Sequence, residues 1–122
     1  LVTAAIIEKN GKYLITQRPK EVHLALKWEF PGGKVEFRED PRSCLEREIE
    51  EELGIKIEAQ DILECSSHVY DGEIHIVLLG FLCRYVSGEI KIEKYAWVKP
   101  EEMISYNIAE ADIPLVKKLS KY

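Results

Sequence analysis

Three glutamates are spaced so that their carboxylates share one edge of a helix. Glu48, Glu51 and Glu52 stand at positions i, i+3 and i+4, which lie on one face of an α-helix. Like charges at this spacing destabilise an isolated helix, and a divalent cation would reverse that effect. Oxygen ligands suit Mg²⁺ or Mn²⁺ rather than zinc, and Mg²⁺ usually combines one or two carboxylates with substrate phosphates. The cluster indicates metal-assisted phosphoanhydride chemistry, with a merely solvated acidic face as the alternative.

The helix that carries these glutamates has recognisable ends. Asp40 is a good N-cap residue, and Pro41 suits the first helical position. Gly54 predicts that the helix stops after Leu53, because glycine adopts the left-handed conformation of a C-terminal cap without strain. The sequence therefore predicts one helix from about residue 41 to residue 53.

The 3.6-residue period of the helix also predicts which of its residues face the core and which face solvent. Leu45, Ile49 and Leu53 form an apolar stripe that must face the core. Glu46 and Glu50 point well away from the acidic edge, and we expect them to be simply solvated. The three clustered carboxylates consequently lie at the border between core and solvent.

The remaining elements are mostly strands. Asn10-Gly11 between two apolar runs is a strong hairpin pattern. We predict strands at Val2–Glu8, Lys12–Arg18, Ile55–Leu63, His68–Tyr70, Ile74–Val86, Glu89–Glu93 and Tyr95–Val98, a loop at Pro19–Lys27, and short helices at Pro100–Ser105 and Pro114–Lys121. Many strands with a few interspersed helices imply an α/β or α+β sheet covered by helices.

Bulk composition narrows the classes of protein. A length of 122 residues favours one domain spanning 1–122, and 46% hydrophobic residues is ordinary for a soluble protein. The net charge of −5 and the lack of a basic stripe argue against a nucleic-acid partner. No apolar run is long enough to span a bilayer, and the apolar start lacks the flanks of a secretory signal. Three cysteines without C-x-x-C spacing suit a reducing cytoplasm, so we expect a cytoplasmic protein without a membrane partner.

The acidic helix lies within a longer pattern. Gly33, five residues, Glu39, seven residues and then Arg47-Glu48-Ile49-x-Glu51-Glu52-x-Gly54-Ile55 matches the Nudix box at every specified position. Seven fixed residues coincide by chance on the order of once in 10⁹ trials, which makes an accidental match with a solvated helix untenable. The chain thus resembles the Nudix family.

The resemblance extends beyond the box. Lys27–Glu36, together with Arg18 and His23 ahead of it, looks like the segment that enters the box in the MutT branch. Ala96–Glu102 resembles a late strand and turn, and Ala109–Pro114 resembles the base-contacting segment of enzymes that act on CTP or oxidised dGTP. The likeness covers nearly the whole chain and is strongest from Arg18 to Ile55.

The resemblance implies a fold and a catalytic platform. The fold would be the Nudix α/β/α sandwich, an α/β class with a mixed sheet between helices. Glu48, Glu51 and Glu52, with the carbonyl of Gly32, would hold Mg²⁺, for which Mn²⁺ is a possible substitute. Glu48 also matches the residue often proposed as general base, although which carboxylate takes the proton stays open. For Gly32 the alternative is a plain turn.

Two further box residues match a pair that orients the acidic helix. Arg47 and Glu39 would form this pair. Alternatively, Arg47 makes only an i,i+4 pair with Glu51, and Glu39 only complements the helix N-terminus. Glu89 or Glu93 would supply an extra metal carboxylate, and the sequence does not decide between them.

The resemblance also assigns residues that bind the substrate. Arg18 would clamp a phosphate, with an exposed strand-end arginine as the alternative. His23 and Glu29 match nucleotide-contacting positions, and a structural histidine is the alternative for His23. Asp112 matches a residue that contacts the base edge, and an ionised carboxylate there would accept hydrogen bonds from a cytosine or guanine-type base. Its alternative is to start the terminal helix ahead of Pro114.

The function implied is Mg²⁺-dependent hydrolysis of a nucleoside triphosphate to a nucleoside monophosphate and pyrophosphate, with CTP, dCTP or an oxidised nucleotide such as 8-oxo-dGTP as substrate. An enzyme of the same family acting on ADP-ribose or a dinucleoside polyphosphate is the alternative. A non-catalytic nucleotide-sensing domain is disfavoured because all box carboxylates are intact. The expected partner is a nucleotide, and the chain would be a monomer or a homodimer.

Overall fold

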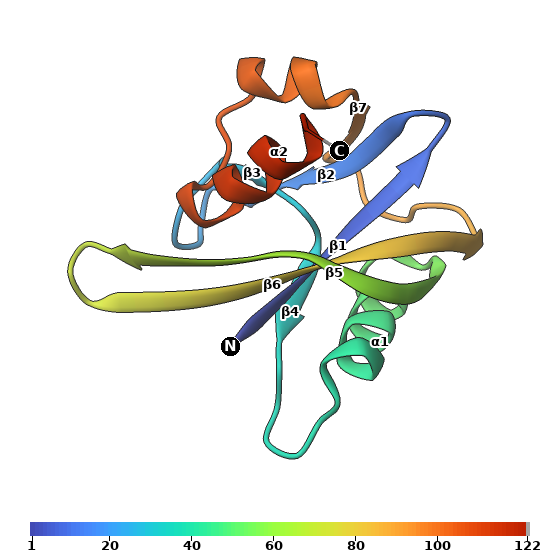
Figure 1. Ribbon diagram of the computed structural model, residues 1–122, viewed down its shortest axis with the longest axis horizontal. Coiled ribbons are helices and arrows are strands. Elements are labelled where there is room, and N and C mark those ends of the chain that lie inside the picture. The colour runs from blue at the N-terminus through green and yellow to red at the C-terminus, as the bar shows by residue number, and fades with distance from the viewer. Residues whose placement is uncertain (122) are drawn as a thin grey trace.

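A mixed β-sheet forms the centre of the computed structural model, which describes residues 1–121 (Figure 1). Its long strands are β1 (Val2–Lys9), β2 (Lys12–Gln17), β5 (Lys56–Tyr70) and β6 (Ile74–Ser87). β1 pairs in parallel with β6, whereas β1 with β2 and β5 with β6 are antiparallel. β5 therefore forms one edge of the sheet.

Three short strands complete the seven strands found within residues 1–121. β3 (Trp28–Glu29) and β7 (Tyr95–Val98) both pair with β2, and β4 (Gly32–Lys34) pairs with β1. All three pairings are antiparallel. Because β3 and β4 are separated by only two residues, the chain passes from beside β2 to beside β1 within a short distance.

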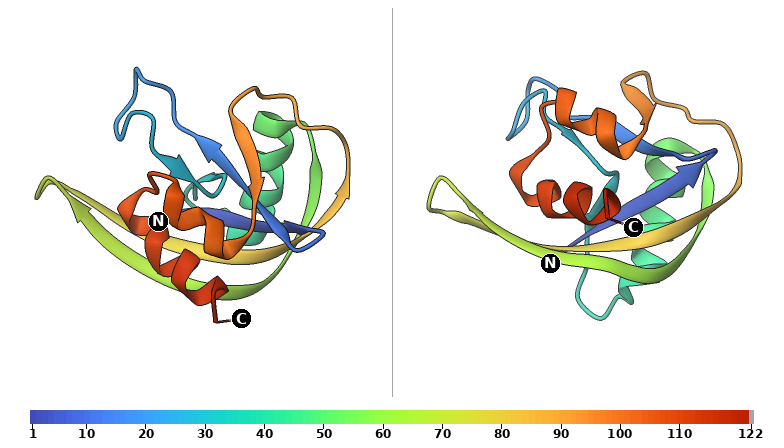
Figure 2. Two further views of the ribbon diagram at one scale, coloured as in Figure 1. Left: turned by 90° about the horizontal axis from the view of Figure 1, so that it is seen from above. Right: turned by 45° about the horizontal axis from the view of Figure 1, so that its top comes forward.

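The helices lie on both faces of the sheet (Figure 2). α1 (Pro41–Leu53) covers one face, and the other carries the 3₁₀ helices η1 (Pro100–Ser105) and η2 (Glu110–Asp112) with α2 (Ile113–Leu119). Alternate residues of β1 enter the two cores, as the two-residue period of a strand requires. The α1 core receives Ala5 and Ile7, and the α2 core receives Ala4 and Ile6. The α/β sandwich with a mixed sheet between helices is confirmed.

The predicted ends of α1 are confirmed in detail. The Asp40 carboxylate accepts a hydrogen bond from the Ser43 N–H at 3.0 Å, and Pro41 is the first helical residue. Gly54 ends the helix in the left-handed conformation at φ 77°, and its N–H donates to the Glu50 carbonyl. These local caps fix where the acidic edge of α1 begins and ends.

The strand predictions need two corrections. The two runs expected at Ile55–Leu63 and His68–Tyr70 are one bulged strand, β5, because its whole length finds a partner in β6. The strand expected at Glu89–Glu93 is wrong. After Gly88, at φ 101°, the segment instead passes the C-terminal end of α1, where the Lys91 N–H donates to the Leu53 carbonyl.

Glu46 does more than contact solvent. Its carboxylate accepts a hydrogen bond from the Ala59 N–H at 2.9 Å, at a point where the register of β5 against β6 shifts. The shift leaves a strand N–H without its regular ladder partner, and the helix supplies the acceptor. Glu50 is half-exposed and 3.8 Å from Lys56, so the expectation of a solvated side chain holds better there.

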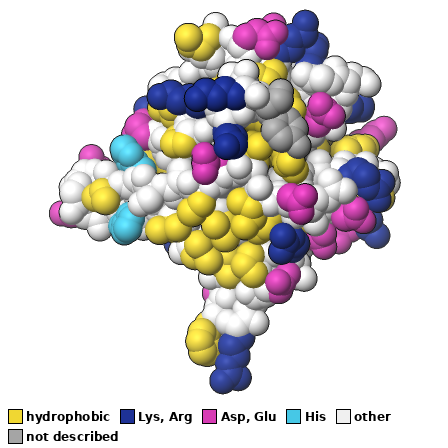
Figure 3. Space-filling model, in the orientation of Figure 1, with side chains coloured by type: hydrophobic (Ala, Val, Ile, Leu, Met, Phe, Trp, Pro, Cys, Tyr) yellow, Lys and Arg dark blue, Asp and Glu magenta, His cyan; other side chains and the backbone are white. Residues whose placement is uncertain are grey.

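The surface shows no strongly basic region on the face in view. Lysine and arginine side chains are interspersed with acidic ones there, and histidines gather near the hairpin of β5 and β6 (Figure 3). Within residues 1–121, no helix has the length and apolar character needed to cross a membrane.

The close packing of α2 on Gly80 of β6 can be tested by substitution. A Cβ at this position would lie 2.7 Å from Cδ2 of Leu115. Gly80→Ala should therefore lower the free energy of unfolding by about 1–3 kcal/mol through overpacking. Denaturant unfolding of Gly80→Ala in the wild-type and Leu115→Val backgrounds checks this, because valine lacks the δ carbons. An equal cost in both backgrounds would show that Leu115 does not limit the space.

Candidate functional site

The acidic edge of α1 is organised by one arginine. Nη2 of Arg47 lies 2.8 Å from a carboxylate oxygen of Glu39, and Nη1 lies 3.3 Å from Glu48 and 3.2 Å from Glu51. Both interpretations of Arg47 are therefore present, the pair with Glu39 and the i,i+4 pair with Glu51. Glu39 also accepts a hydrogen bond from the Glu36 N–H, and its contact with Arg47 lowers its pKa. One guanidinium thus ties the loop before α1 to two of the clustered carboxylates.

Glu52 is the member of the cluster whose charge is least compensated. Partial burial and the hydrogen bond and charge of Glu48 raise the pKa of Glu52 to about 7. The more distant charge of Glu29 contributes in the same direction. Because like charges oppose ionisation, a cation placed beside Glu48 and Glu52 would bring the pKa down again.

Gly33 of β4 brings backbone into close contact with this edge, and its neighbour Gly32 packs against β1. A Cβ on Gly33 would lie 2.9 Å from the carboxyl carbon of Glu48, and one on Gly32 only 1.9 Å from the Thr3 carbonyl oxygen. The Thr3 hydroxyl donates to the Gly33 carbonyl at 3.2 Å. These contacts explain why side chains are absent at both positions. That the Gly32 carbonyl is a metal ligand stays a prediction.

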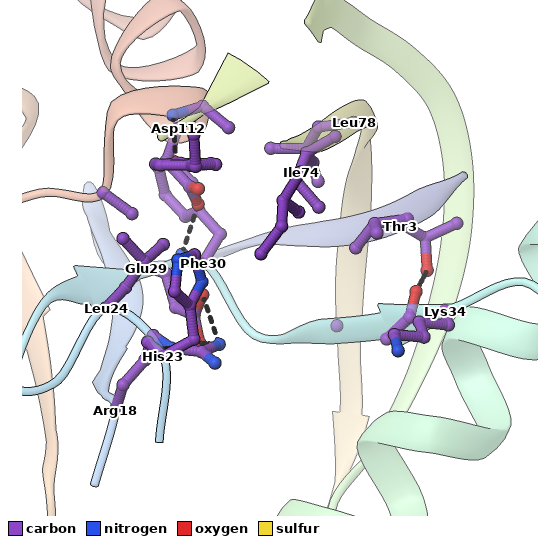
Figure 4. Close-up of a pocket in the computed structure, with 17 residues that line it drawn as sticks. Thr3, Arg18, His23, Leu24, Glu29, Phe30, Lys34, Ile74, Leu78 and Asp112 are labelled. Carbon is purple, nitrogen blue, oxygen red and sulfur yellow. Dashed lines mark hydrogen bonds and ion pairs between the residues drawn. The ribbon is translucent and has the colours of Figure 1, made fainter. Parts of the chain in front are cut away.

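A cavity of about 380 Å³ extends from these glycines to the start of α2 (Figure 4). Its lining comes from the ends of β1 and β6, the segment 18–34, Tyr70 of β5 and η2. Arg18, His23, Glu29 and Asp112 all line it, as do Gly32 and Gly33. The structure therefore brings together every residue predicted to bind the substrate, although they are up to 94 positions apart in the sequence.

Arg18 and Glu29 form an ion pair in the wall of this cavity. Nη1 of Arg18 lies 3.2 Å from Glu29, and its Nε donates to the His23 carbonyl at 2.7 Å. Burial raises the pKa of Glu29, and the charge of Arg18 partly offsets that rise. Arg18 thus holds the loop and β3 together and is partly buried in the cavity wall, and its role as a phosphate clamp stays a prediction. His23 lies 3.7 Å from Asp71 of the β5–β6 turn, with its ring edge against Tyr70.

Asp112 is buried at the inner end of the cavity. Its side chain accepts a hydrogen bond from the Phe30 N–H at 2.9 Å, and the residue is 5% exposed. Burial raises the pKa of Asp112 to about 8, and the nearby Glu29 adds to that rise. A carboxyl group with this pKa is mostly protonated at neutral pH, so that it can donate as well as accept. That Asp112 contacts the base edge stays a prediction. Asp112 also occupies the N-cap position of α2, as the helix-start alternative expects, but its side chain makes no capping hydrogen bond there.

The donor set fits a hard divalent cation. Glu48, Glu51 and Glu52 offer only oxygen atoms, and Glu48 and Glu52 are close enough to share a hydrogen bond. Within residues 1–121, no three acidic, histidine or cysteine side chains already converge as a complete cage for a metal. An ion that keeps water or phosphate ligands does not require one. Glu89 contributes to a different surface hollow with Lys9 and Trp97, and the question of an extra ligand stays open.

Two residues of β5 were not predicted from the sequence as part of the site. The Ser66 hydroxyl donates to the Ala111 carbonyl, and the Ala111 N–H donates to the Tyr70 hydroxyl at 2.8 Å. The only trace in the sequence is a serine on the inward side of a strand, and its partner lies 45 residues away.

Comparison with known proteins agrees with this geometry. The model of the NUDIX domain matches residues 2–118. The CTP pyrophosphohydrolase of Escherichia coli K12 is 40% identical over 119 residues, covering 95% of this chain and 87% of that protein. The 8-oxo-dGTP diphosphatase of Proteus vulgaris is 35% identical over 94 residues, covering 77% and 83%. The crystal structure of a MutT Nudix hydrolase from Burkholderia pseudomallei superposes with a TM-score of 0.86 at 28% identity, covering 96% and 95%.

The chain belongs to the Nudix family of hydrolases. Hydrolases of this family generally need a divalent cation, which agrees with the crowded carboxylates of α1.

Because Asp112 is buried, we predict that the free energy of unfolding depends on pH. Its pKa is about 8 in the folded protein, against an ordinary 3.8 when unfolded. The contribution of Asp112 to the free energy of unfolding is fully present below pH 3.8, and it is lost as the pH rises through 8. Asp112→Asn, which keeps an acceptor for Phe30 but cannot ionise, should exceed the wild type in free energy of unfolding at pH 8 by on the order of a few kcal/mol. The difference should shrink towards pH 4.

Denaturant unfolding across pH 4–9 measures this difference. Asp40→Asn is the matched control, because the hydrogen bond from the Ser43 N–H lowers the pKa of Asp40. Its carboxylate stabilises the fold above its ordinary pKa, and that stability is lost as the pH falls. Parallel curves for Asp112→Asn and the wild type would contradict the raised pKa of Asp112.

Proposed function

We propose that this protein hydrolyses nucleoside triphosphates to a nucleoside monophosphate and pyrophosphate, with Mg²⁺ as its cofactor and Mn²⁺ as a substitute. The observation that carries the proposal is one continuous cavity. The buried Asp112 lines one part of it, and Gly33, which lies against the Glu48 carboxylate of the acidic edge, lines another. The names of the relatives support nucleoside triphosphates as the substrate class.

The phosphate end is built from the acidic edge of α1. Glu48, Glu51 and Glu52 would hold the ion, which neutralises phosphate charge and makes a water molecule more acidic when bound. Arg47 keeps Glu48 and Glu51 at fixed positions through its contacts of 3.3 and 3.2 Å. Glu39 in turn holds Arg47, so that the carboxylates are oriented before substrate arrives.

The reaction is a hydrolysis at the β-phosphorus. Glu48 takes a proton from the attacking water, the water oxygen bonds to the β-phosphorus, and the bond between that phosphorus and the oxygen bridging to the α-phosphate breaks. The bridging oxygen leaves with the nucleoside monophosphate, and the attacking oxygen remains on pyrophosphate. Positioning and electrostatics supply most of the rate acceleration in such phosphoryl transfers.

The base end favours a ring edge that presents a donor and an acceptor together. A protonated Asp112 donates through its hydroxyl and accepts through its oxygen atoms. Cytosine offers a ring nitrogen beside an amine, and guanine-type bases offer a carbonyl beside a ring N–H. Asp112 is therefore compatible with both CTP and 8-oxo-dGTP, the substrates named for two relatives.

A product assay tests the substrate class. With Mg²⁺, CTP, dCTP or 8-oxo-dGTP should yield equimolar nucleoside monophosphate and pyrophosphate, while ADP-ribose and dinucleoside polyphosphates should be poor substrates. Excess chelator should abolish turnover, and added Mn²⁺ should restore it, because the carboxylates need a hard cation. Chromatography of the nucleotide products and a pyrophosphate assay measure both outcomes. Release of inorganic phosphate alone, or preference for ADP-ribose, would contradict the proposal.

Glu48→Gln tests the role of the carboxylate beside Gly33. The amide keeps the size of the side chain but cannot take a proton, so kcat should fall by at least about a hundredfold with little loss of stability. Glu50→Gln, on the outer face of the same helix, is the matched control and should keep near-normal kcat. Steady-state kinetics and thermal unfolding of both variants separate a loss of catalysis from a loss of stability. Near-normal turnover in Glu48→Gln would refute its role.

A further inference from the structure

The segment that carries Asp112 is held by two side chains of the opposite strand. The Ser66 hydroxyl donates to the carbonyl of Ala111, and the Tyr70 hydroxyl accepts from the N–H of Ala111 at 2.8 Å. Ser66 and Tyr70 are 6% and 5% exposed, so water does not compete for these bonds. Both hydrogen-bonding groups of one residue are therefore bound by β5 side chains four positions apart.

The same segment is held from the other side by β3. The Ala109 N–H donates to the Trp28 carbonyl and the Trp28 N–H to the Asn107 carbonyl, at 2.9 and 2.8 Å. One residue further along β3 is Glu29, and the next, Phe30, donates its N–H to the Asp112 carboxyl. Segment 107–112 is thus fixed between a strand on the near side of the cavity and two side chains on the far side.

We propose that Ser66 and Tyr70 are positioning residues for nucleobase recognition, which fix the depth and direction of the Asp112 carboxyl by binding the preceding residue. This inference rests on the proposed function and deepens it, since it names what sets the base-reading group in place. Neither side chain needs to touch the phosphates. Loss of either bond leaves a buried polar group of Ala111 without its partner, and the segment shifts to find water.

The arrangement explains why a buried carboxyl is tolerated at the end of the cavity. Asp112 lies next to the fixed Ala111, and its own N–H donates to the Ala109 carbonyl at 2.9 Å. With the preceding backbone held in this way, the hydrogen bond from the Phe30 N–H keeps the carboxyl directed into the cavity. Its discrimination between bases then depends on a position set by residues that are 41 and 45 positions away from Ala111.

Three single variants test the inference by steady-state kinetics on CTP and 8-oxo-dGTP. Ser66→Ala and Tyr70→Phe should raise KM about tenfold while kcat stays within about twofold, because base binding and not the phosphate end is disturbed. The ratio of kcat/KM between the two substrates should change about threefold or more. Ser66→Thr, which keeps the hydroxyl, should restore most of the affinity.

Ser67→Ala and Tyr85→Phe are matched controls. Ser67 contacts His75, and as the next residue along β5 it points to the other face of the sheet. The Tyr85 hydroxyl donates to the Gly88 carbonyl, far along β6 from the cavity. Both should behave as the wild type. A general loss of folded protein would lower the apparent kcat for both substrates equally, and an unchanged substrate ratio would overturn the inference.

Carbon-13 NMR titration of the Asp112 carboxyl separates this inference from the proposed function, because it needs no substrate. In Ser66→Ala and Tyr70→Phe the midpoint should fall by at least about one pH unit from its wild-type value, as water reaches the freed segment. The midpoint in the two control variants should not move. If no nucleotide is hydrolysed at all, a shifted midpoint still supports the positioning, and an unshifted one overturns it.

The wild-type protein provides a further test, which remains possible even if the variants do not fold. Hydrogen exchange of the Ala111 amide, followed by NMR, should be at least about a hundredfold slower than that of the exposed Gly72 amide in the β5–β6 turn. Exchange of Ala111 as fast as that of Gly72 would show that Tyr70 does not hold the segment, and would overturn the inference.

Discussion

Electrostatic repulsion among four carboxylates, with a single guanidinium to compensate it, is the constraint on which this site depends. Arg47 contacts Glu39, Glu48 and Glu51 within 3.3 Å, and Glu52 is left with a pKa raised to about 7. The fold tolerates this arrangement because α1 is fixed independently, by its caps and by the apolar stripe that packs on β1. In the proposed function, the uncompensated charge is what would attract a dication to this edge.

The close approach of backbone to the same edge is the second requirement. Gly33 leaves room for the Glu48 carboxyl, and Gly32 leaves room for the Thr3 carbonyl. The two glycines belong to β4, which pairs with β1, so that the sheet holds them in register. At the other end of the cavity, Asp112 sits between β3 and β5 side chains. The sheet thus fixes the distance between the acidic edge and Asp112.

Short-range sequence patterns predicted much of the acidic helix and of the hairpin between β1 and β2. The caps Asp40 and Gly54, the spacing of the acidic residues and the Asn10-Gly11 turn act over a few residues, and each is confirmed in place. Long-range effects were not predictable. A register shift turns Glu46 into a partner of β5, the end of α1 diverts the segment after Gly88, and burial keeps a proton on Asp112. Each of these effects depends on which segments of the chain come into contact in the fold. Residue types alone do not specify those contacts. The roles of the predicted site residues stay predictions.

Paramagnetic broadening by Mn²⁺ tests the central claim most directly. Trace Mn²⁺ added to the nitrogen-15-labelled protein should first broaden the backbone amide signals of Gly33, Glu48 and Glu52, and excess Mg²⁺ should reverse the effect. The amides of the β5–β6 turn should remain sharp at the same ratio. Broadening centred away from α1, or no broadening at all, would contradict the account that the crowded carboxylates of this helix hold the metal.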